Sequence, residues 1–413
     1  MGIATSTNKV NVLKRLWGDK VQEPMYKKSK AYGLCSKSTD FTNEGRYVVI
    51  SMSPTAGGSA TFSDALASQE AAAEVRFFVT PKREYHVFGL DGLYLAQSEG
   101  NPKALVKGYE HEANKARYSF ARALSKRFWG NGGGSLGRIK AGHTLTLSTL
   151  TLRERMDITG FEKNMQLEFA SDDGTGTSPA GRRGAPDRLT INGAIDRDAG
   201  TLGLSGALNT VSSINADDYI FRRGDYNAAM TGLRGWVPTS DPSGSESFFG
   251  LDRSIQDISR VSGVRVSAAA TYEETLINAS AEAAINGCEP GDCFVNPLDF
   301  ASIVKELGSV VRIEVNTKMP GISFSALQIH GNAGPIRIIS EADVPKGFFW
   351  MGNIETVYHR TAGEAMRILN EDGAGKMLRA PDADAYQARI GCYGNFTVEG
   401  DMGPGGWVCG AFT

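Results

Sequence analysis

Apolar positions along the chain recur with two different periods, and the longest helical pattern covers residues 101–129. Apolar side chains occur there every three or four residues, the spacing of one face of an α-helix. Asn101 is a favourable N-cap residue and Pro102 suits the first helical position. A helix of this length spans about 40 Å, which suits a strut across a flat molecule. The apolar stripe consists of Leu105, Tyr109, Ala113, Ala116, Phe120, Leu124 and Phe128, and the charged residues outside it are Lys107, Glu110, Arg117 and Arg122.

Two strand-like runs precede this helix, at residues 46–53 and 74–88. Pro81 confines the second strand to a sheet edge or breaks it. The segment between the runs, TAGGSATFSDALASQEAAA, is rich in small residues and predicts a long hairpin with a mobile tip. Because a lone two-stranded ribbon is not stable in water, we expect this hairpin to lie on something else, such as another subunit.

Residues 140–235 are rich in Thr, Gly, Ser and Asp, and they predict a small β-subdomain inserted after the long helix. The strand candidates are short, and flexible turns separate them. Residues 239–247 have the composition of a linker or exposed loop. The candidate strands are residues 144–151, 165–169, 188–192, 201–204 and 219–222.

The last part of the chain alternates helices and strands, which predicts an α/β domain with a mostly buried sheet. Thr271 and Glu274 form a capping box at the start of a helix over residues 271–286. Asn296 caps a second helix, which begins at Pro297 and ends near Leu307. The final strands must return toward the first half. The predicted strands are residues 292–295, 310–315, 323–330, 335–340, 347–359, 365–370 and 386–398.

A glycine-rich run, FWGNGGGSLGR, covers residues 128–138 and contains G-x-G-x-x-G at Gly132, Gly134 and Gly137. A dinucleotide-binding turn needs a strand before this motif and a helix after it. Here the long helix comes first, so its carbonyl end would meet the phosphate. The run therefore predicts a structural hinge in which Gly130, Gly132 and Gly134 end the helix and turn the chain. Phe128 and Trp129 would anchor the helix end in the core.

No other residue pattern indicates catalysis, a cofactor or a metal site, so the chain is not expected to be an enzyme. The five cysteines and five histidines are dispersed, which favours buried thiols in a reducing compartment. Arg223-Gly224-Asp225 spells RGD but favours a plain turn after a strand. The acidic pairs Asp217/Asp218 and Asp382/Asp384 are expected to be solvated.

Composition limits the partners. The chain has 413 residues, of which 44 are Lys or Arg and 46 are Asp or Glu, giving a net charge of −2. This near-neutral balance argues against strong general affinity for nucleic acid or anionic membranes, although it allows a protein that encloses DNA without gripping it. No apolar run approaches the roughly 18 to 20 residues that a membrane helix needs.

Five segments, in order, resemble the major capsid proteins of tailed bacteriophages: KARYSFARALSKRFWGNGGGSLGRI (115–139), DYIFRRGDYNAAMTGLRGWVP (218–238) with FFGLDRS (248–254), CFVNPLDFASIVKELGS (293–309), GPIRIISEADVPKG (334–347) and DADAYQARIGCYGNF (382–396). The resemblance implies an α+β, HK97-like capsid fold. Its parts would be an N-terminal arm (1–45), an E-loop hairpin with its strands (46–90), a P-domain spine-helix region (91–139), an inserted β-rich subdomain of the P-domain (140–238), an axial A-domain (239–345) and a return of the A-domain with C-terminal P-domain strands (346–413).

The resemblance also implies a function. The chain would assemble as pentamers and hexamers into an icosahedral virion shell, built in the bacterial host cytoplasm around double-stranded DNA that it contacts weakly and non-specifically. Expected partners are a portal and cement or decoration proteins. Residues 1–45 are too short for the scaffolding segment of many relatives, so we expect a separate scaffolding protein. Because the hairpin tip has no lysine, we expect no covalent cross-link.

Assembly contacts are expected in two places. Val10, Leu13 and Trp17 predict a short amphipathic arm helix, which either clamps a neighbour or packs on its own domain. The hairpin contributes the candidates Tyr47, Phe62, Arg76, Phe77, Lys82 and Arg83. One alternative is an encapsulin-like compartment shell, which shares the fold. A second alternative is a phage tail-tube or fibre protein, which would not need a long strut helix followed by an α/β domain.

Overall fold

The computed structural model describes residues 29–42, 44–53, 57–91, 102–175, 181–184, 188–244, 247–307, 313–315, 325–332, 334–369, 378–379, 385–400 and 402–412. Val10, Leu13 and Trp17 of the expected arm helix lie outside the described residues, as does the acidic pair Asp382/Asp384.

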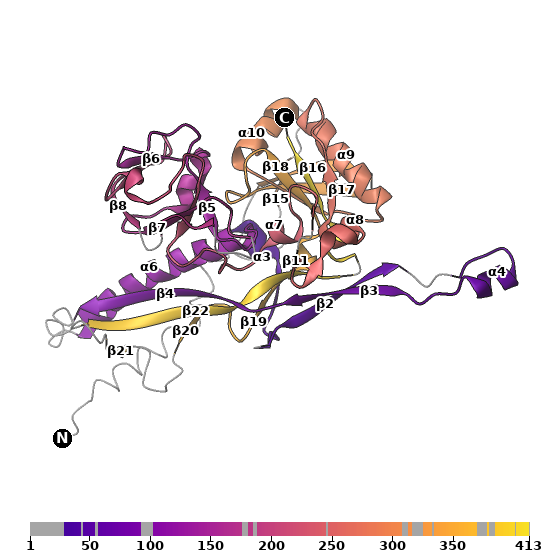
Figure 1. Cartoon of the computed structure of the whole chain (residues 1–413), viewed down its shortest axis with the longest axis horizontal. Coiled ribbons are helices and arrows are strands. Elements are labelled where there is room, and N and C mark those ends of the chain that lie inside the picture. Colours follow the sequence, from indigo (N-terminus) through magenta and orange to yellow (C-terminus); the bar gives the residue numbers. More distant parts are fainter. Residues whose placement is uncertain are drawn as a thin grey trace, which may run out of the picture.

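A long strand near the C-terminus organises the centre of the molecule. This strand, β22 (Ala385–Val398), pairs with β4 (Lys82–Asp91) along its whole first part. The sheet runs β1 (Ser36–Ser38), β19 (Val357–Thr361), β22 and β20 (Arg367–Ile368), with β4 and β21 (Leu378–Arg379) also paired to β22. The C-terminal segment therefore returns to the first half of the chain, as the sequence predicts (Figure 1).

The long helix α6 (Pro102–Phe128) packs on β4 and β22. Its stripe positions Ala113, Ala116, Phe120 and Leu124 are buried in the main core, which confirms the predicted face. Arg117 departs from the expectation because it is buried although it lies outside the stripe. Arg117 lies four residues after Ala113 and three before Phe120, and residues at these spacings share one face of a helix.

A β-rich unit follows α6 and has its own hydrophobic core. Its sheet has the order β5 (Ser135–Arg138), β10 (Tyr219–Arg222), β7 (Gln166–Ala170), β8 (Leu189–Asp196), β9 (Thr201–Leu204) and β6 (Thr149–Thr151), with short 3-10 turns at Arg155–Gly160 and Leu208–Thr210. The five short strands predicted for this segment are all present. The first is shorter than expected, because residues 144–148 form turns instead of extended chain.

The third unit is a mixed sheet flanked by two helices. Its order is β13 (Val264–Val266), β23 (Val408–Ala411), β18 (Phe348–Gly352), β14 (Asp292–Val295), β17 (Gly334–Ser340), β16 (Ser325–Gly331) and β15 (Ile313–Val315). The helices are α9 (Tyr272–Ile285) and α10 (Pro297–Leu307), and the Thr271 side chain accepts a hydrogen bond from the amide of Glu274 as predicted.

Residues 347–359, predicted as one strand, are two strands in different sheets. β18 ends at Gly352, a 3-10 turn (Ile354–Thr356) follows, and β19 then enters the β22 sheet. Short elements connect the units: α7 (Leu233–Trp236), β11 (Ser247–Phe248), β12 (Leu251–Asp252), a 3-10 turn (Arg253–Ile255), α8 (Ile258–Ser262) and another 3-10 turn (Gly403–Gly406).

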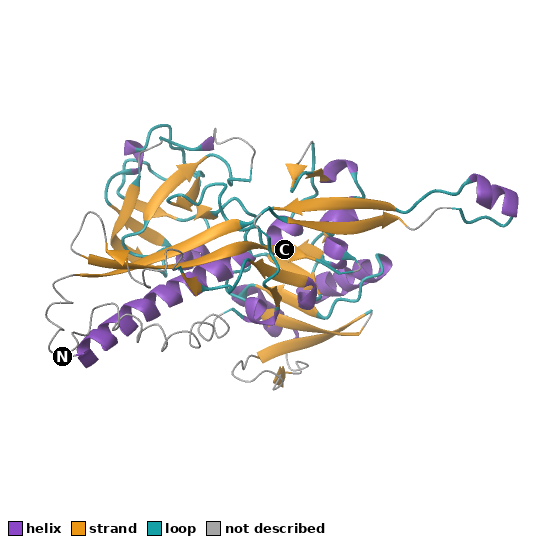
Figure 2. Cartoon of the chain, turned by 90° about the horizontal axis from the view of Figure 1, so that it is seen from below, coloured by secondary structure: helices purple, strands orange, loops and turns teal. Residues whose placement is uncertain are grey.

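The hairpin is β2 (Arg46–Ser53) paired antiparallel with β3 (Ala73–Val79), and it projects well beyond the rest of the chain (Figures 1 and 2). Its far end carries a short helix, α4 (Phe62–Ala67), where the sequence predicted only a mobile tip. Pro81 breaks the second strand-like run, since β4 begins at Lys82 and joins a different sheet. A short helix, α3 (Lys30–Leu34), precedes β1 and contacts the 3-10 turn Ile354–Thr356.

Candidate functional site

The hairpin has a buried root and an exposed outer part. Phe77 is fully buried and meets the Trp236 ring at 5.2 Å and the Phe248 ring at 5.9 Å between centroids. The amide of Phe78 donates a hydrogen bond of 2.9 Å to the carbonyl of Phe249. Beyond the root, nothing else in the described chain covers the tip, as both views show (Figures 1 and 2).

Large apolar side chains are exposed on this hairpin. Tyr47 is 62% exposed, and on the tip helix Phe62 is 84% and Leu66 is 60% exposed. Single exposed apolar residues are ordinary on protein surfaces, but a group of them on one projecting element marks an interaction site. The hairpin is therefore the first candidate assembly surface.

The hairpin residues predicted as assembly contacts differ in their exposure to solvent. The prediction that Phe77 is an assembly contact is corrected, because Phe77 is buried inside its own chain, where β3 directs alternate side chains to the core. Arg76 and Arg83 are exposed. Lys82 is half-buried and donates from Nζ to the carbonyl of Asn227 at 3.2 Å. Lys82 thus contacts the segment after β10 of its own chain.

The end of α6 joins two sheets. The Phe128 ring meets Phe396 of β22 at 5.4 Å, and the Trp129 ring meets Phe294 of β14 at 5.5 Å and Trp350 of β18 at 5.8 Å. Both side chains are buried. The geometry is that of an anchor, as the sequence predicts for these two aromatics.

The glycine run after this anchor makes a tight turn. Gly132 and Gly134 both have φ of +93° and make the turn, whereas Gly130 follows the end of the helix without a positive φ. A Cβ on Gly134 would lie 2.2 Å from the carbonyl oxygen of Asp225. The run therefore lets the turn after β10 approach closely. The chain continues into strand β5, so no helix N-terminus is available for a phosphate.

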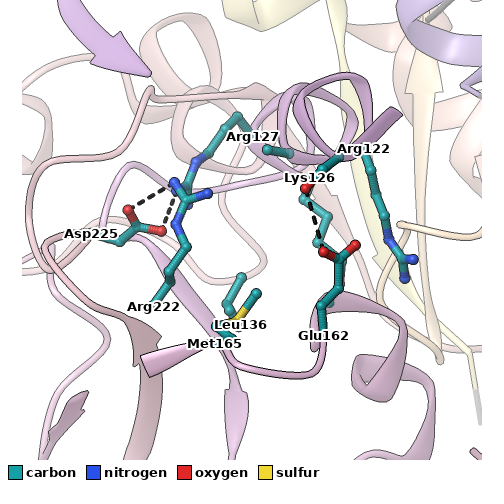
Figure 3. A pocket seen from close by; sticks show the side chains of 11 residues that line it. Arg122, Lys126, Arg127, Leu136, Glu162, Met165, Arg222 and Asp225 are labelled. Carbon is teal, nitrogen blue, oxygen red and sulfur yellow. Dashed lines mark hydrogen bonds and ion pairs between the residues drawn. The ribbon is translucent and has the colours of Figure 1, made fainter. Parts of the chain in front are cut away.

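Beside this turn, four charged side chains form a closed ring that sequence reasoning missed. Arg127 donates from Nε to Glu84 at 3.0 Å and also pairs with Asp225, while Arg222 pairs with Glu84 and, at 3.0 Å, with Asp225. Figure 3 shows both guanidinium groups beside the Asp225 carboxylate. The ring ties α6, β4 and the turn after β10 together.

The ion pairs in the ring favour the charged forms of Glu84 and Arg127. Burial would raise the pKa of Glu84, but the charges of Arg127 and Arg222 outweigh it and lower that pKa. Burial would likewise lower the pKa of Arg127, which Glu84 and Asp225 instead raise. The RGD sequence forms a turn in which Gly224 has φ of +82°. Its Asp225 also forms an ion pair with Arg222.

A polar groove lies next to the ring. It has a volume of about 530 Å³ and is lined by β4, by Ser119 of α6, by residues 162–166 leading into β7 and by the turn after β10. Arg83, Lys163 and Arg223 are its exposed cations. Glu162, from the same wall, accepts a hydrogen bond from Ser119 of α6 at 3.4 Å. The groove is the second candidate surface.

In the described part of the chain, the cysteines and the acidic residue Asp218 have structural surroundings. All five cysteines are buried free thiols. Asp218, expected to be solvated, is buried and pairs with Arg183 at 2.9 Å. Among the described residues, no group of His, Cys, Asp and Glu has the geometry of a metal site. Within that same set of residues, no helix has the length and apolar character to span a bilayer.

Comparison with solved structures identifies the fold. The chain aligns over 91% of its length with 90% of a chain from the cyanophage A-1(L) capsid asymmetric unit, at a TM-score of 0.51 and 9% identity. A chain from the capsid of a native GTA particle aligns over 94% of this chain and 90% of its own (TM-score 0.46, 9% identity), and one of Gordonia phage Cozz over 94% and 87% (TM-score 0.40, 11% identity).

Of these three likenesses, the cyanophage chain is the one whose TM-score indicates a shared fold. No protein-family model and no curated protein sequence matches the chain. The protein thus has an α+β fold of the kind found in phage capsid proteins, which confirms the predicted fold at that level. More particularly, the fold resembles that of a chain in the cyanophage A-1(L) capsid asymmetric unit over about nine-tenths of both chains.

Proposed function

We propose that this chain is the major capsid protein of a tailed double-stranded DNA phage, closing an icosahedral shell as pentamers and hexamers. The capsid fold over 91% of the chain carries the proposal. The projecting hairpin supports it, because an element with exposed Phe62 and Leu66 needs a partner to cover it. The role is assembly, with no catalytic step.

In this proposal the subunit has six parts, at the bounds expected from the sequence. Residues 1–45 form the arm, 46–90 the E-loop and its strands, and 91–139 the region of spine helix α6. The β-rich unit within 140–238 elaborates the P-domain, the sheet and helices of 239–345 form the axial A-domain, and 346–413 return through both. The pairing of β4 with β22 supports one P-domain built from both ends of the chain.

Assembly in this scheme proceeds by many modest contacts that closed symmetry multiplies. The hairpin lies over an adjacent subunit, and the axial loops meet around the five- and six-fold axes. A net charge of −2 suits a wall that encloses DNA without holding it. A separate scaffolding protein, a portal and decoration proteins complete the particle.

Expression of the chain with negative-stain microscopy tests the proposal. Shells or capsomers are expected, whereas tubes would indicate a tail protein, and a co-purifying protein cargo in place of DNA would indicate a storage compartment. Free monomers under all conditions, including co-expression with the scaffolding protein of the same genome, would refute it. Boiled mature particles should give monomer bands on a denaturing gel, since we expect no covalent cross-link.

Deletion of residues 55–73 tests the hairpin separately. The root contacts of Phe77 with Trp236 and Phe248 lie outside the deleted segment, so the subunit should fold. Shell closure should be lost. Particles of normal size from this deletion would overturn the assignment of the hairpin as an assembly element.

A further inference from the structure

One face of α6 carries polar and cationic residues toward the β-rich unit. Ser119, Arg122 and Lys126 follow one another at intervals of three and four, so they share one face of the helix. All three line a pocket of about 40 Å³ between α6 and the β-rich unit. Figure 3 shows Arg122 and Lys126 extending from the helix on the side of Glu162. The helix therefore brings two positive charges into one small cavity.

Neither of these two cations forms an ion pair or a side-chain hydrogen bond with the described residues. By contrast, the two other guanidinium groups in the pocket wall, on Arg127 and Arg222, are paired in the charged ring. Two like charges one turn apart on a helix repel each other, and a charge removed from water needs a partner. The described part of the chain does not place such a partner against either cation.

Burial acts on both cations. It lowers the pKa of Lys126 and the pKa of Arg122 from their ordinary values, and neighbouring guanidinium groups act in the same direction. Asp343 opposes this effect at both residues, helped by Asp157 at Lys126 and by Glu162 at Arg122, but these carboxylates do not outweigh burial. A further negative charge in the pocket would therefore stabilise both charged forms.

The pocket has room for a small anion. One water molecule needs roughly 10 to 15 Å³ of such space, and the pocket has about 40 Å³. A Cβ on Gly160 would lie 2.8 Å from Nζ of Lys126, so the glycine leaves space for the ammonium group at the wall. The pocket opens into the polar groove, because Ser119, Met165 and Arg222 line both. An anion can therefore enter from the groove.

The groove outside the pocket is also mainly positive. Its exposed cations are Arg83, Lys163 and Arg223. Glu162 is the opposing acid, half-buried where the groove meets the pocket. A concave surface lined by one sign of charge raises the local concentration of ions of the opposite sign. The approach therefore favours anions, and Glu162 is the group that works against them.

We propose that the pocket binds a small oxyanion of the phosphate class, held by the Lys126 ammonium, the Arg122 guanidinium and the Ser119 hydroxyl. A bound anion fastens the β-rich unit to α6. Free phosphate and a backbone phosphate of nucleic acid share this chemistry, and the small size of the pocket favours the free ion. The inference goes beyond the proposed function and does not depend on it, because one subunit contains the whole site.

Calorimetric titration of the purified full-length subunit with inorganic phosphate tests the site directly. We expect saturable binding with one site per chain. Thermal unfolding at matched ionic strength should show a Tm that rises with phosphate concentration, because the ligand binds the folded state. Phosphate also stabilises proteins by exclusion from their surface, so the Tm must be compared between variants. Titration without saturable binding would overturn the proposal.

Substitutions in the pocket should change the affinity in opposite directions. Arg122→Gln and Lys126→Gln should each weaken phosphate binding about tenfold, the effect of losing one charge-assisted hydrogen bond. Glu162→Gln keeps the shape of the side chain and removes the opposing charge, so binding should tighten about threefold. Lys140→Gln, at an exposed cation of the β-rich unit outside the pocket, is the matched control and should stay within about twofold.

Unchanged affinity in the first two variants, or weaker binding in Glu162→Gln, would overturn the assignment. If either cation proves necessary for folding, the calorimetry of the unmodified chain and of Glu162→Gln still decides. Saturable phosphate binding by a chain that never forms shells would refute the capsid function and keep the site.

A short DNA duplex used as the titrant identifies the source of the phosphate. We expect free phosphate not to compete with it. If phosphate did compete, and Arg122→Gln weakened the binding of DNA, the pocket would hold a backbone phosphate and the oxyanion site would stand. If free phosphate did not bind, and DNA binding was lost in Lys163→Gln with Arg223→Gln but not in Arg122→Gln, the groove would be a nucleic-acid surface and the proposed pocket site would be wrong.

Discussion

Replacing Arg127 with methionine tests whether the charged ring holds the subunit together. The Arg127 side chain is 6% exposed and bridges Glu84, which is 3% exposed, to Asp225. Methionine keeps much of the volume but leaves both carboxylates with Arg222 as their remaining partner in the ring. Removing one member of a buried ion pair typically costs about 3 to 5 kcal/mol, because it leaves uncompensated charge.

The assay is urea unfolding of the purified subunit, followed by tryptophan fluorescence and circular dichroism. Trp129 is two residues from Arg127 and buried, so its emission reports on this junction. Arg197→Met, at an exposed turn between β8 and β9, is the matched control and should change the free energy of unfolding by less than about 0.5 kcal/mol.

Glu84→Gln in the Arg127→Met background provides the decisive comparison. If the cost comes from unpaired negative charge, removing one carboxylate should recover part of it, and the two substitutions should be strongly non-additive. A loss below about 1 kcal/mol for Arg127→Met, or simple additivity with Glu84→Gln, would refute the reasoning and mark the ring as dispensable.

Four further outcomes follow from the same contacts. Gly134→Ala should lower the free energy of unfolding by more than about 2 kcal/mol, because φ is +93° and the new Cβ would meet the Asp225 carbonyl. Gly142→Ala, also at positive φ but in open space, should lower it by about 1 kcal/mol. Equal losses would contradict the close approach at Gly134. Burial and Asp343 raise the pKa of Glu341 from its ordinary value of 4.5 to about 7. The stability that protonated Glu341 contributes is therefore fully present below pH 4.5 and is lost as the pH rises through about 7. Glu341→Gln should flatten this decline of the free energy of unfolding with pH in urea titrations, and an unchanged slope would exclude Glu341 as its cause. Phe62→Ser should leave subunit stability within about 0.5 kcal/mol and reduce shell yield, and normal shells would show that Phe62 is not a contact. Because burial raises the pKa of the cysteine thiols, for example to about 12 at Cys392, the native subunit should react slowly with a thiol reagent and rapidly once unfolded.

Local patterns in the sequence are enough to predict most elements of this fold. The apolar stripe places α6 to within one residue at each end, and the capping residues Thr271 and Asn296 locate the helices that follow them. These features depend on neighbours within four positions in the chain. The strand-like run that predicts β2 is equally local.

Contacts between distant segments could not be predicted in the same way. The ring joins residues 84, 127, 222 and 225, and no spacing in the sequence marks a pair that is 43 or 98 positions apart. From the sequence, Phe77 cannot be distinguished from an exposed aromatic residue of the hairpin, because the residues that bury it, Trp236 and Phe248, are distant in the chain. The division of residues 347–359 between two sheets likewise depends on which partners each half finds.

Under the proposed function, stability and assembly depend on different parts of the molecule. The end of α6, with Phe128, Trp129 and the charged ring, joins the three units through buried contacts that need no partner chain. The hairpin is fixed at its root by Phe77, yet it leaves Phe62 and Leu66 in solvent. A two-stranded ribbon gains little stability alone, so its apolar surface is best buried on a second subunit. Changes at the tip should therefore alter the yield of particles, and changes at the ring should alter the yield of folded chains.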